Sequence, residues 1–203
     1  MKSVLIVLVV LVLGGVVWYS IQTKPDASVP AATVSDVSTT TEDKNVVADE
    51  SINKPVTQVK EIDNTNVKIS FKGFGPGKVH NGSFAKIDSK LSFEASGSLE
   101  GEVVVDMSSL STDNEGKLTP HLKSADFFDV AKYPTATFKV TSLKDGKLSG
   151  VMTTHGISKN VSFDVVSSDK ELSSKFNIDM KEFGINQKFA NEVIELTVTV
   201  PLK

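Results

Sequence analysis

The chain has 203 residues, which is enough for one domain with additional segments or for two small domains. Its 22 basic residues are all lysines, and 25 acidic residues give a net charge of −3, so the composition argues against sequence-specific nucleic-acid binding. The sequence contains no cysteine, which excludes disulfides, thiolate metal sites, a cysteine nucleophile and a lipid-modified cysteine.

The first 21 residues predict a membrane anchor. A long apolar run extends from Val4 to Ile21, with Trp18 and Tyr19 near its end and Lys2 before it. As a helix this run would span about 27 Å, close to the hydrocarbon thickness of a bilayer. We therefore predict a single-pass transmembrane signal anchor over 1–21, with the following chain on the extracytoplasmic side. The alternative is a cleaved signal peptide, which would leave the protein secreted.

The composition changes abruptly after the apolar run. Residues 22–60 are rich in Thr, Ser, Asp, Glu and Lys, include three prolines and contain no aromatic residue. Such a segment buries too little apolar surface to offset the entropy of ordering it. It is predicted to be a flexible linker that holds the next domain roughly 35 Å from the membrane.

Residues 61–203 alternate between apolar and polar side chains in the manner of β-strands. The clearest runs are 67–71, 161–165, 176–180 and 194–202, in which every second residue is apolar. Gly, Asn and Asp separate the runs, and Asp145-Gly146 between two of them is a strong hairpin signal. About eight antiparallel strands of this kind predict a sandwich or an up-and-down barrel.

One interval departs from the strand pattern. Residues 111–134 have the character of a turn and a short helix, with Thr119 as the predicted N-cap and Pro120 at the first helical position. A helix at this point would cover one end of a barrel. The aromatic residues that follow either close the core or line a pocket.

No recognised catalytic or metal-binding motif is present. His80, His121 and His155 are far apart in the sequence and show no metal-ligand spacing. The carboxylate pairs Glu100/Glu102 and Asp113/Glu115 lie at predicted turns, where solvation accounts for them without acid–base catalysis. We therefore predict no catalytic residues, no metal and no cofactor.

The segment 121–138, HLKSADFFDVAKYPTATF, resembles the signature of the YceI-like family. Residues 150–159 and 181–185 are similar to two further motifs of that family, in the expected order. The resemblance covers residues 62–202. It implies an extracytoplasmic, lipocalin-like antiparallel β-barrel with a helix near its mouth, which binds an isoprenoid or another amphiphilic lipid in its lumen and has no established catalytic activity.

A lumen of this kind would be lined by large apolar side chains that point inward from successive strands. Burial of hydrocarbon there would favour binding by roughly 0.8 kcal/mol per methylene. The candidate lumen residues are Phe84, Phe93, His121, Phe127, Phe128, Phe138, Met152, Phe163 and Phe176.

Three functions remain open from the sequence. The leading prediction is a membrane-tethered lipid-binding or carrier protein. The alternative is a structural or interaction domain whose barrel is solid and binds no lipid. An enzyme acting on a hydrophobic substrate is the third, although no convergent set of polar residues is visible. The oligomeric state is not predicted.

Overall fold

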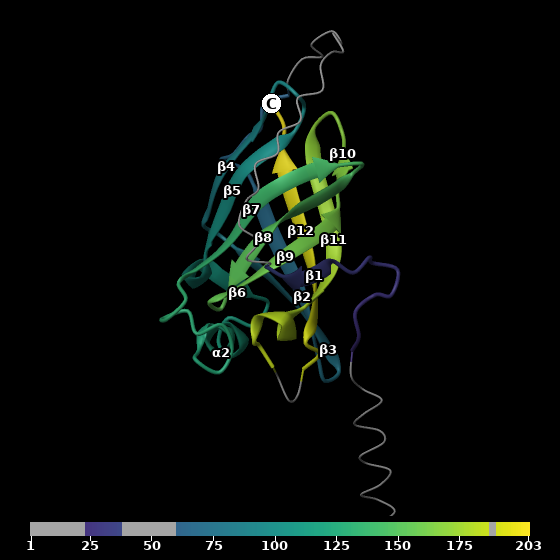
Figure 1. The fold of residues 1–203 in the computed structure, drawn as a ribbon. Coiled ribbons are helices and arrows are strands. Elements are labelled where there is room, and N and C mark those ends of the chain that lie inside the picture. The colour runs from purple at the N-terminus through teal and green to yellow at the C-terminus, as the bar shows by residue number, and fades with distance from the viewer. Residues whose placement is uncertain (1–22, 38–59, 187–189) are drawn as a thin grey trace, which may run out of the picture.

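The computed structural model describes residues 23–37, 60–186 and 190–203. They form two six-stranded antiparallel sheets that face each other across one hydrophobic core (Figure 1). The first sheet has the strand order β1 (Thr33–Asp36), β9 (Ile157–Asp164), β8 (Lys147–Thr154), β7 (Thr135–Lys144), β5 (Leu99–Asp106) and β4 (Ile87–Phe93). The second has the order β10 (Val166–Ser167), β11 (Glu171–Asp179), β12 (Val193–Pro201), β2 (Lys68–Gly75), β3 (Lys78–Phe84) and β6 (Leu110–Thr112).

The predicted all-β class with antiparallel strands is confirmed, and the period-two alternation accounts for it. In β2, for example, Phe71 is buried on the core side while its neighbour Lys72 reaches the surface. The predicted hairpin at Asp145-Gly146 is also confirmed, because both residues have positive φ and connect Lys144 directly to Lys147. Positive φ at both central positions is the requirement of a type I′ turn, whose twist matches that of the strands.

Within residues 23–37, 60–186 and 190–203 the helices are few and short. They are η1 (Met107–Ser109), α2 (Leu118–Lys123) and η2 (Met180–Phe183). All three lie at the edge of the sheets that also carries the β2–β3 turn. We call this edge the helical end. The turns after β4, β7 and β10, together with the C-terminus, lie at the opposite end, which we call the far end (Figure 1).

The prediction of a closed barrel is wrong in one respect, because the hydrogen-bonded ladder is interrupted at two seams. One seam separates β4 from the second sheet, and there the Asn64 side chain bonds to the edge of β4. The other separates β9 from β11. At this second seam β1 pairs with β9, and Ala31 forms a bridge with Asn177 of β11. Asn64 thus covers the edge at the first seam, and the segment that contains Ala31 and β1 joins the two sheets at the second.

The N-terminal region also differs from its prediction. Residues 23–37 fall within the predicted flexible linker, yet they pack on the domain and include strand β1. The physical reason is tertiary: Val29 is buried and Ala32 and Val34 pack against the core, so this stretch buries apolar surface that its composition alone did not suggest. The rest of the predicted linker, 38–59, and the predicted anchor, 1–21, lie outside the described residues. Among the residues described, no helix is long and apolar enough to cross a membrane.

Candidate functional site

An apolar cavity of about 150 Å³ lies between the two sheets. Its wall draws on strands of both sheets and extends from Met107 and Met180 at the helical end to Leu143 and Leu148 toward the far end. Among the described residues no charged side chain lines it, and its few polar residues are Thr137, Thr154, Ser173 and Ser174. Ser174 already donates its hydroxyl to the carbonyl oxygen of Asp164, at 2.6 Å. The cavity therefore offers an almost purely apolar environment.

Aromatic rings form two groups in this wall. Phe71 of β2 and Phe84 of β3 lie 5.8 Å apart between ring centroids. The second group joins the two sheets, because Phe163 of β9 stacks on Phe176 of β11 at 4.2 Å and Phe138 of β7 contacts Phe163 at 5.5 Å. The stacked pair spans the β9–β11 seam on the inner side, so aromatic packing closes the lumen where strand pairing does not.

Two glycines leave room for these rings at the wall. A Cβ at Gly82 of β3 would overlap the ring of Phe71 on the neighbouring strand. A Cβ at Gly150 of β8 would likewise overlap the ring of Phe138. Each ring lies against the glycine backbone, in space that a side chain at that position would otherwise occupy. The two rings therefore fill less of the space between the sheets. This arrangement explains how a small β-domain with many phenylalanines keeps an internal space.

Six of the nine predicted lumen residues line the cavity. They are Phe84, Phe128, Phe138, Met152, Phe163 and Phe176. Phe93, His121 and Phe127 do not, which corrects their assignment to the lumen. Phe93 is the last residue of β4 and packs against the core beyond the cavity, toward the far end. His121 is exposed on α2, and Phe127 lies between the rings of His121 and Phe128 without reaching the cavity.

The sequence reasoning missed several lining residues. The most prominent are Phe71, Met107 and Met180, which belong to the buried core and line the cavity. Phe71 sits on the apolar face of a correctly predicted strand, so its alternation with Ser70 and Lys72 carried the necessary signal. Met107 and Met180 are the first residues of the short helices η1 and η2. Met180 also ends the alternating run 176–180, so the sequence did carry a signal for it.

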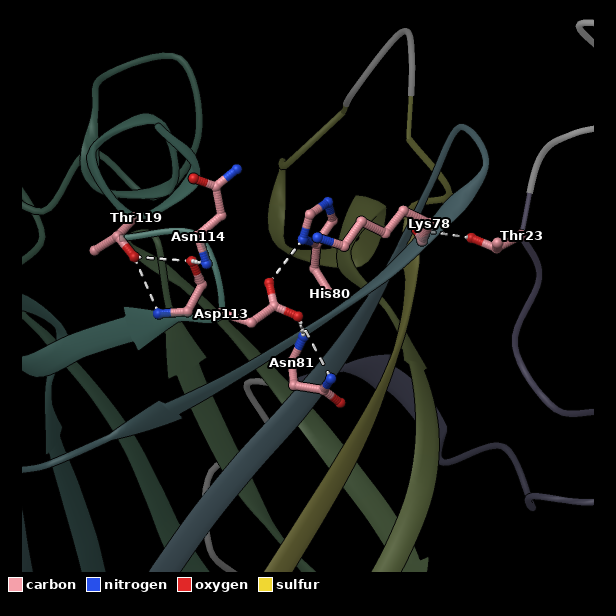
Figure 2. A network of polar contacts seen from close by, with 8 residues as sticks. Thr23, Lys78, His80, Asn81, Asp113, Asn114 and Thr119 are labelled. Atoms are coloured by element: carbon pink, nitrogen blue, oxygen red, sulfur yellow. Dashed lines mark hydrogen bonds and ion pairs between the residues drawn. The ribbon is translucent and has the colours of Figure 1, made fainter. Parts of the chain in front are cut away.

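A polar network anchors the segment that carries α2 (Figure 2). Asp113 receives a hydrogen bond from the backbone N–H of Asn81 at 3.0 Å and pairs with Nδ1 of His80 at 2.8 Å. These interactions, the Asn81 bond first, hold the pKa of the Asp113 carboxyl below its usual value. The backbone N–H of Asp113 in turn donates to the carbonyl of Asn81 at 2.9 Å. Strand β3 thereby fixes the start of the β6–α2 connection.

The predicted N-cap of the helix is wrong. Helix α2 begins at Leu118 and is preceded by Lys117, which makes no side-chain cap. Thr119 lies inside the helix, and its hydroxyl accepts from the backbone N–H of Thr112 at 3.0 Å, so it ties the helix to β6 (Figure 2). The carbonyl of Asn114 accepts from the N–H groups of Leu118 and Thr119, which satisfies the free donors of the first turn without a capping side chain.

The three histidines have separate structural environments. His80 pairs with Asp113, the ring of His121 contacts that of Phe127, and Nδ1 of His155 donates to the carbonyl of Phe183 at 3.2 Å. Within the part of the chain that the structure describes, no three His, Cys, Asp or Glu residues are grouped to hold a metal ion. None of the histidines lines the cavity.

The cavity can accept an apolar guest of limited size. An engineered apolar cavity of about 150 Å³ in another protein remains dry and binds benzene, so a space of this size accepts about six carbon atoms. One isoprene unit has five. The lining includes three methionines, Met107, Met152 and Met180, whose flexible thioether side chains adapt readily to a guest. Fold and cavity together define an all-β protein with an apolar lumen between its two sheets.

Similarity to known proteins specifies this class further. Residues 60–203 match the family model of the YceI-like domain, and the chain belongs to that family. A UPF0312 protein of Vibrio cholerae is 30% identical over 151 residues, which cover 66% of this chain and 78% of the relative. The protein YceI of Escherichia coli is 35% identical over 136 residues, which cover 59% of this chain and 71% of the relative.

Two solved structures share the fold. The crystal structure of BcnA from Burkholderia cenocepacia superposes with a TM-score of 0.58 at 17% identity and covers 70% of this chain and all of that one (100%). A structure from Saccharophagus degradans, described as a polyisoprenoid-binding domain, superposes with a TM-score of 0.53 at 13% identity and covers 71% of this chain and 98% of that one. At these identities the likeness concerns the fold alone.

Proposed function

We propose that this protein is a membrane-tethered, extracytoplasmic binding or carrier protein for an isoprenoid or another amphiphilic lipid, whose hydrocarbon part enters the lumen. The observation that carries the proposal is the cavity of about 150 Å³, whose wall is apolar and free of charge. Membership in the YceI-like family and a structural neighbour described as a polyisoprenoid-binding domain support the choice of ligand. The apolar run Val4–Ile21 supports the membrane tether.

The size of the cavity limits how the ligand is held. Burying five or six carbon atoms contributes about 4–5 kcal/mol before the cost of association is subtracted. A longer prenyl chain requires the lumen to widen. The methionine side chains can change rotamer, and the two sheets can move apart at the interrupted seams. We therefore expect the terminal isoprene unit to be buried first and the remainder of a long chain to bind only as the sheets adjust.

The charged end of an amphiphile would remain outside the cavity. Within the part of the chain that the structure describes, no Lys, Asp, Glu or His lines the wall, and a charge placed there without a partner would be strongly unfavourable. The protein is therefore expected to select the ligand by the shape and length of its hydrocarbon, with little dependence on the headgroup.

A pair of neighbouring substitutions on β7 tests the proposal. Val140 is buried and lines the cavity, whereas the adjacent Lys139 is exposed on the outer face. The Val140→Phe side chain would occupy space needed by the guest and is expected to lower affinity by about 2 kcal/mol, roughly thirtyfold. Lys139→Phe adds the same ring on the outside and should leave binding unchanged.

The measurement is mass spectrometry of lipids extracted from the full-length chain, purified in polymer-bounded native membrane discs. Bulk bilayer lipid is common to all variants, so a lumen ligand is recognised as a species that is abundant with the wild type and Lys139→Phe but depleted with Val140→Phe. Identical lipid profiles for all three chains, with no uptake of added polyprenol, would contradict the proposal and favour a structural or interaction domain.

A further inference from the structure

The first described residues are fastened to the helical end of the domain. The Thr23 hydroxyl lies 2.8 Å from the carbonyl oxygen of Gly75 and 3.1 Å from that of Lys78, so it can donate to either (Figure 2). The backbone N–H of Thr23 also donates to Gly75, at 3.3 Å. Gly75 and Lys78 flank the β2–β3 turn, so this contact fixes where the chain enters the domain.

A second set of bonds holds the next residues on β11. The backbone N–H of Asn177 donates to the carbonyl of Pro30 at 2.8 Å, and its own carbonyl accepts from the N–H of Ala32 at 2.8 Å. The Asn177 side-chain amide donates to the carbonyls of Asp26 and Val29, at 3.1 and 3.0 Å. Asn177 is buried beneath this segment, so four hydrogen bonds from one residue hold residues 26–32 in place.

A third set secures strand β1 on the edge of β9. Four residues of β1 pair in antiparallel register with Lys159 to Ser162. The ammonium group of Lys159 lies 2.7 Å from the carboxylate of Asp36, and the Asn160 side-chain amide donates to the carbonyl of Asp36 at 3.0 Å. Residues 23–37 therefore form a continuous strap, fastened at its beginning, middle and end, and we refer to them as the N-terminal strap.

The strap leaves almost no free chain before the predicted membrane anchor. Only Gln22 lies between Ile21, the last residue of the apolar run, and Thr23 on the β2–β3 turn. Two extended residues span at most about 7 Å, which is far less than the roughly 35 Å expected for a flexible linker. If Val4–Ile21 is embedded in a bilayer, the β2–β3 turn must lie close to its surface.

We infer that the N-terminal strap holds the helical end of the domain against the outer surface of the membrane, with the β2–β3 turn in contact with the lipid headgroups. This inference rests on the membrane tether of the proposed function and deepens it by assigning an orientation and a docking surface. The turn suits an interface, because Lys78 and the apolar Val79 are adjacent and both exposed.

The orientation has a consequence for ligand transfer. The helical end carries α2 and the aromatic pair Phe127–Phe128, and Phe128 lines the cavity. A lipid leaving the bilayer would meet this end first. The strap thus places the lumen close to the membrane, which is the source of the lipid ligand. A flexible linker would instead leave the domain at a distance from the membrane.

Fluorescence quenching by membrane lipids tests the orientation. The chain has no cysteine, so single substitutions allow labelling at one site without other changes. Lys78→Cys places a bimane label on the β2–β3 turn, and Ala95→Cys places it on the exposed turn between β4 and β5 at the far end. The nine residues of β12 alone span about 30 Å along the domain, which separates the two positions well.

The full-length chain is reconstituted into vesicles of phosphatidylcholine and phosphatidylglycerol that contain headgroup-labelled nitroxide lipid. The label at residue 78 should be strongly quenched and the label at residue 95 should not. Equal lack of quenching at both sites, in a chain that remains with the vesicles, would overturn the orientation while leaving the tether intact. A chain that an alkaline carbonate wash removes from membranes would overturn the tether and the orientation together.

A linker insertion shows whether the strap is responsible. Twelve Gly and Ser residues placed between Gln22 and Thr23 form a coil of about 19 Å and leave the strap's own contacts unchanged. Quenching at residue 78 should then fall toward the level at residue 95. Quenching that persists would mean that the turn binds lipid by itself, which would overturn the role assigned to the strap.

A cross-linking experiment distinguishes a strap on its own domain from one exchanged between two copies. Ser35 and Asn160 are register partners, and residues directly opposite in antiparallel strands are close enough for a disulfide. The double variant Ser35→Cys/Asn160→Cys should oxidise within one chain. A mixture of the two single variants should give no cross-linked dimer, and a dimer would overturn the assignment of the strap to its own domain.

Discussion

At the scale of single residues, the size of the lumen depends on two glycines as much as on the aromatic side chains. Gly82 and Gly150 lie under the rings of Phe71 and Phe138, and any side chain there would meet those rings. The number of phenylalanines in the sequence is therefore a poor guide to whether the interior is filled. What matters is where each ring lies, and this depends on the residue across the strand pair.

Substitution of Gly82 by alanine provides a direct test of this view. The new methyl group would push the ring of Phe71 toward the lumen, because the three nearest atoms around the added Cβ all belong to that ring. We expect a loss of about 1–3 kcal/mol in unfolding free energy, measured by urea denaturation, together with weaker lipid binding. The matched control is Gly73→Ala on β2, where nothing lies within 4 Å of the added atom. A smaller loss for Gly82→Ala than for the control would contradict the explanation.

The residue scale also shows which functional assignments can be made from sequence. Phe84, Phe138, Phe163 and Phe176 lie on strands and line the cavity, which agrees with the alternation that determines which face a side chain occupies. His121 and Phe127 were misplaced because they belong to α2 and the loop after it, where no such alternation applies. Alternation indicates the face a side chain occupies but not how far the cavity extends along the strand, since Phe93 at the end of β4 lies beyond it. In the loop after α2, Phe128 lines the cavity and Phe127 does not, and no local pattern distinguishes the two.

At the scale of elements, the two seams are the points at which the fold could open. Asn64 closes the exposed edge of β4: its amide nitrogen donates to the carbonyl of Leu91 at 2.9 Å. Its amide oxygen accepts from the backbone N–H of Leu91 and the hydroxyl of Ser89, at 2.9 and 2.6 Å. One side chain therefore takes the place of a neighbouring strand at this edge.

We expect Asn64→Ala to destabilise the protein by about 2–3 kcal/mol, since three hydrogen bonds are lost and the backbone groups of Leu91 are left without these partners. Hydrogen exchange should increase in β4 more than in β7 or β8. Asn66→Ala serves as the control, because Asn66 bonds only to the nearby Asp63 and Thr65 at the surface. Unchanged exchange in β4 of the Asn64 variant would show that the seam is closed by other contacts.

The N-terminal strap illustrates why composition failed as a guide to structure. Its sequence contains two prolines and is otherwise mostly Ala, Val, Ser, Thr and Asp, without any aromatic residue, which is typical of a linker. Its partners, however, include Lys159 and Asn177, which lie more than a hundred residues further along the chain. The free energy that orders the strap comes from these distant contacts, so no local pattern could reveal it.

At the scale of the whole molecule, surface carboxylates determine how the fold responds to acid. The pKa values of Asp36 and Asp106 are lowered, mainly by hydrogen bonds from Lys159 and from the side chain of Ser108 respectively. The pKa of Asp113 is lowered chiefly by its hydrogen bond from Asn81. A carboxyl group with a lowered pKa in the folded state stabilises the protein above its unfolded pKa, and this contribution is lost as the pH falls through the folded value.

The stabilisation from these three carboxyl groups is therefore expected to be complete above about pH 5 and to be lost as the pH falls below about pH 4, where the unfolded chain binds protons more readily. The thermal midpoint measured across this range should fall less steeply in Asp113→Asn, which removes one of the linked carboxyl groups. An acid transition of the same steepness in the variant and the wild type would show that Asp113 does not contribute.

The sequence by itself determined the antiparallel β class, the position of the Asp145-Gly146 turn and the apolar character of the interior. These properties follow from local rules, namely the two-residue period of strands and the backbone demands of tight turns. Only the tertiary structure decided how the two sheets meet and which rings face the cavity. It also decided that residues 23–37 pack against β9 and β11. Those outcomes depend on contacts between residues far apart in the chain, whose pairing is settled by packing and not by any pattern within one segment.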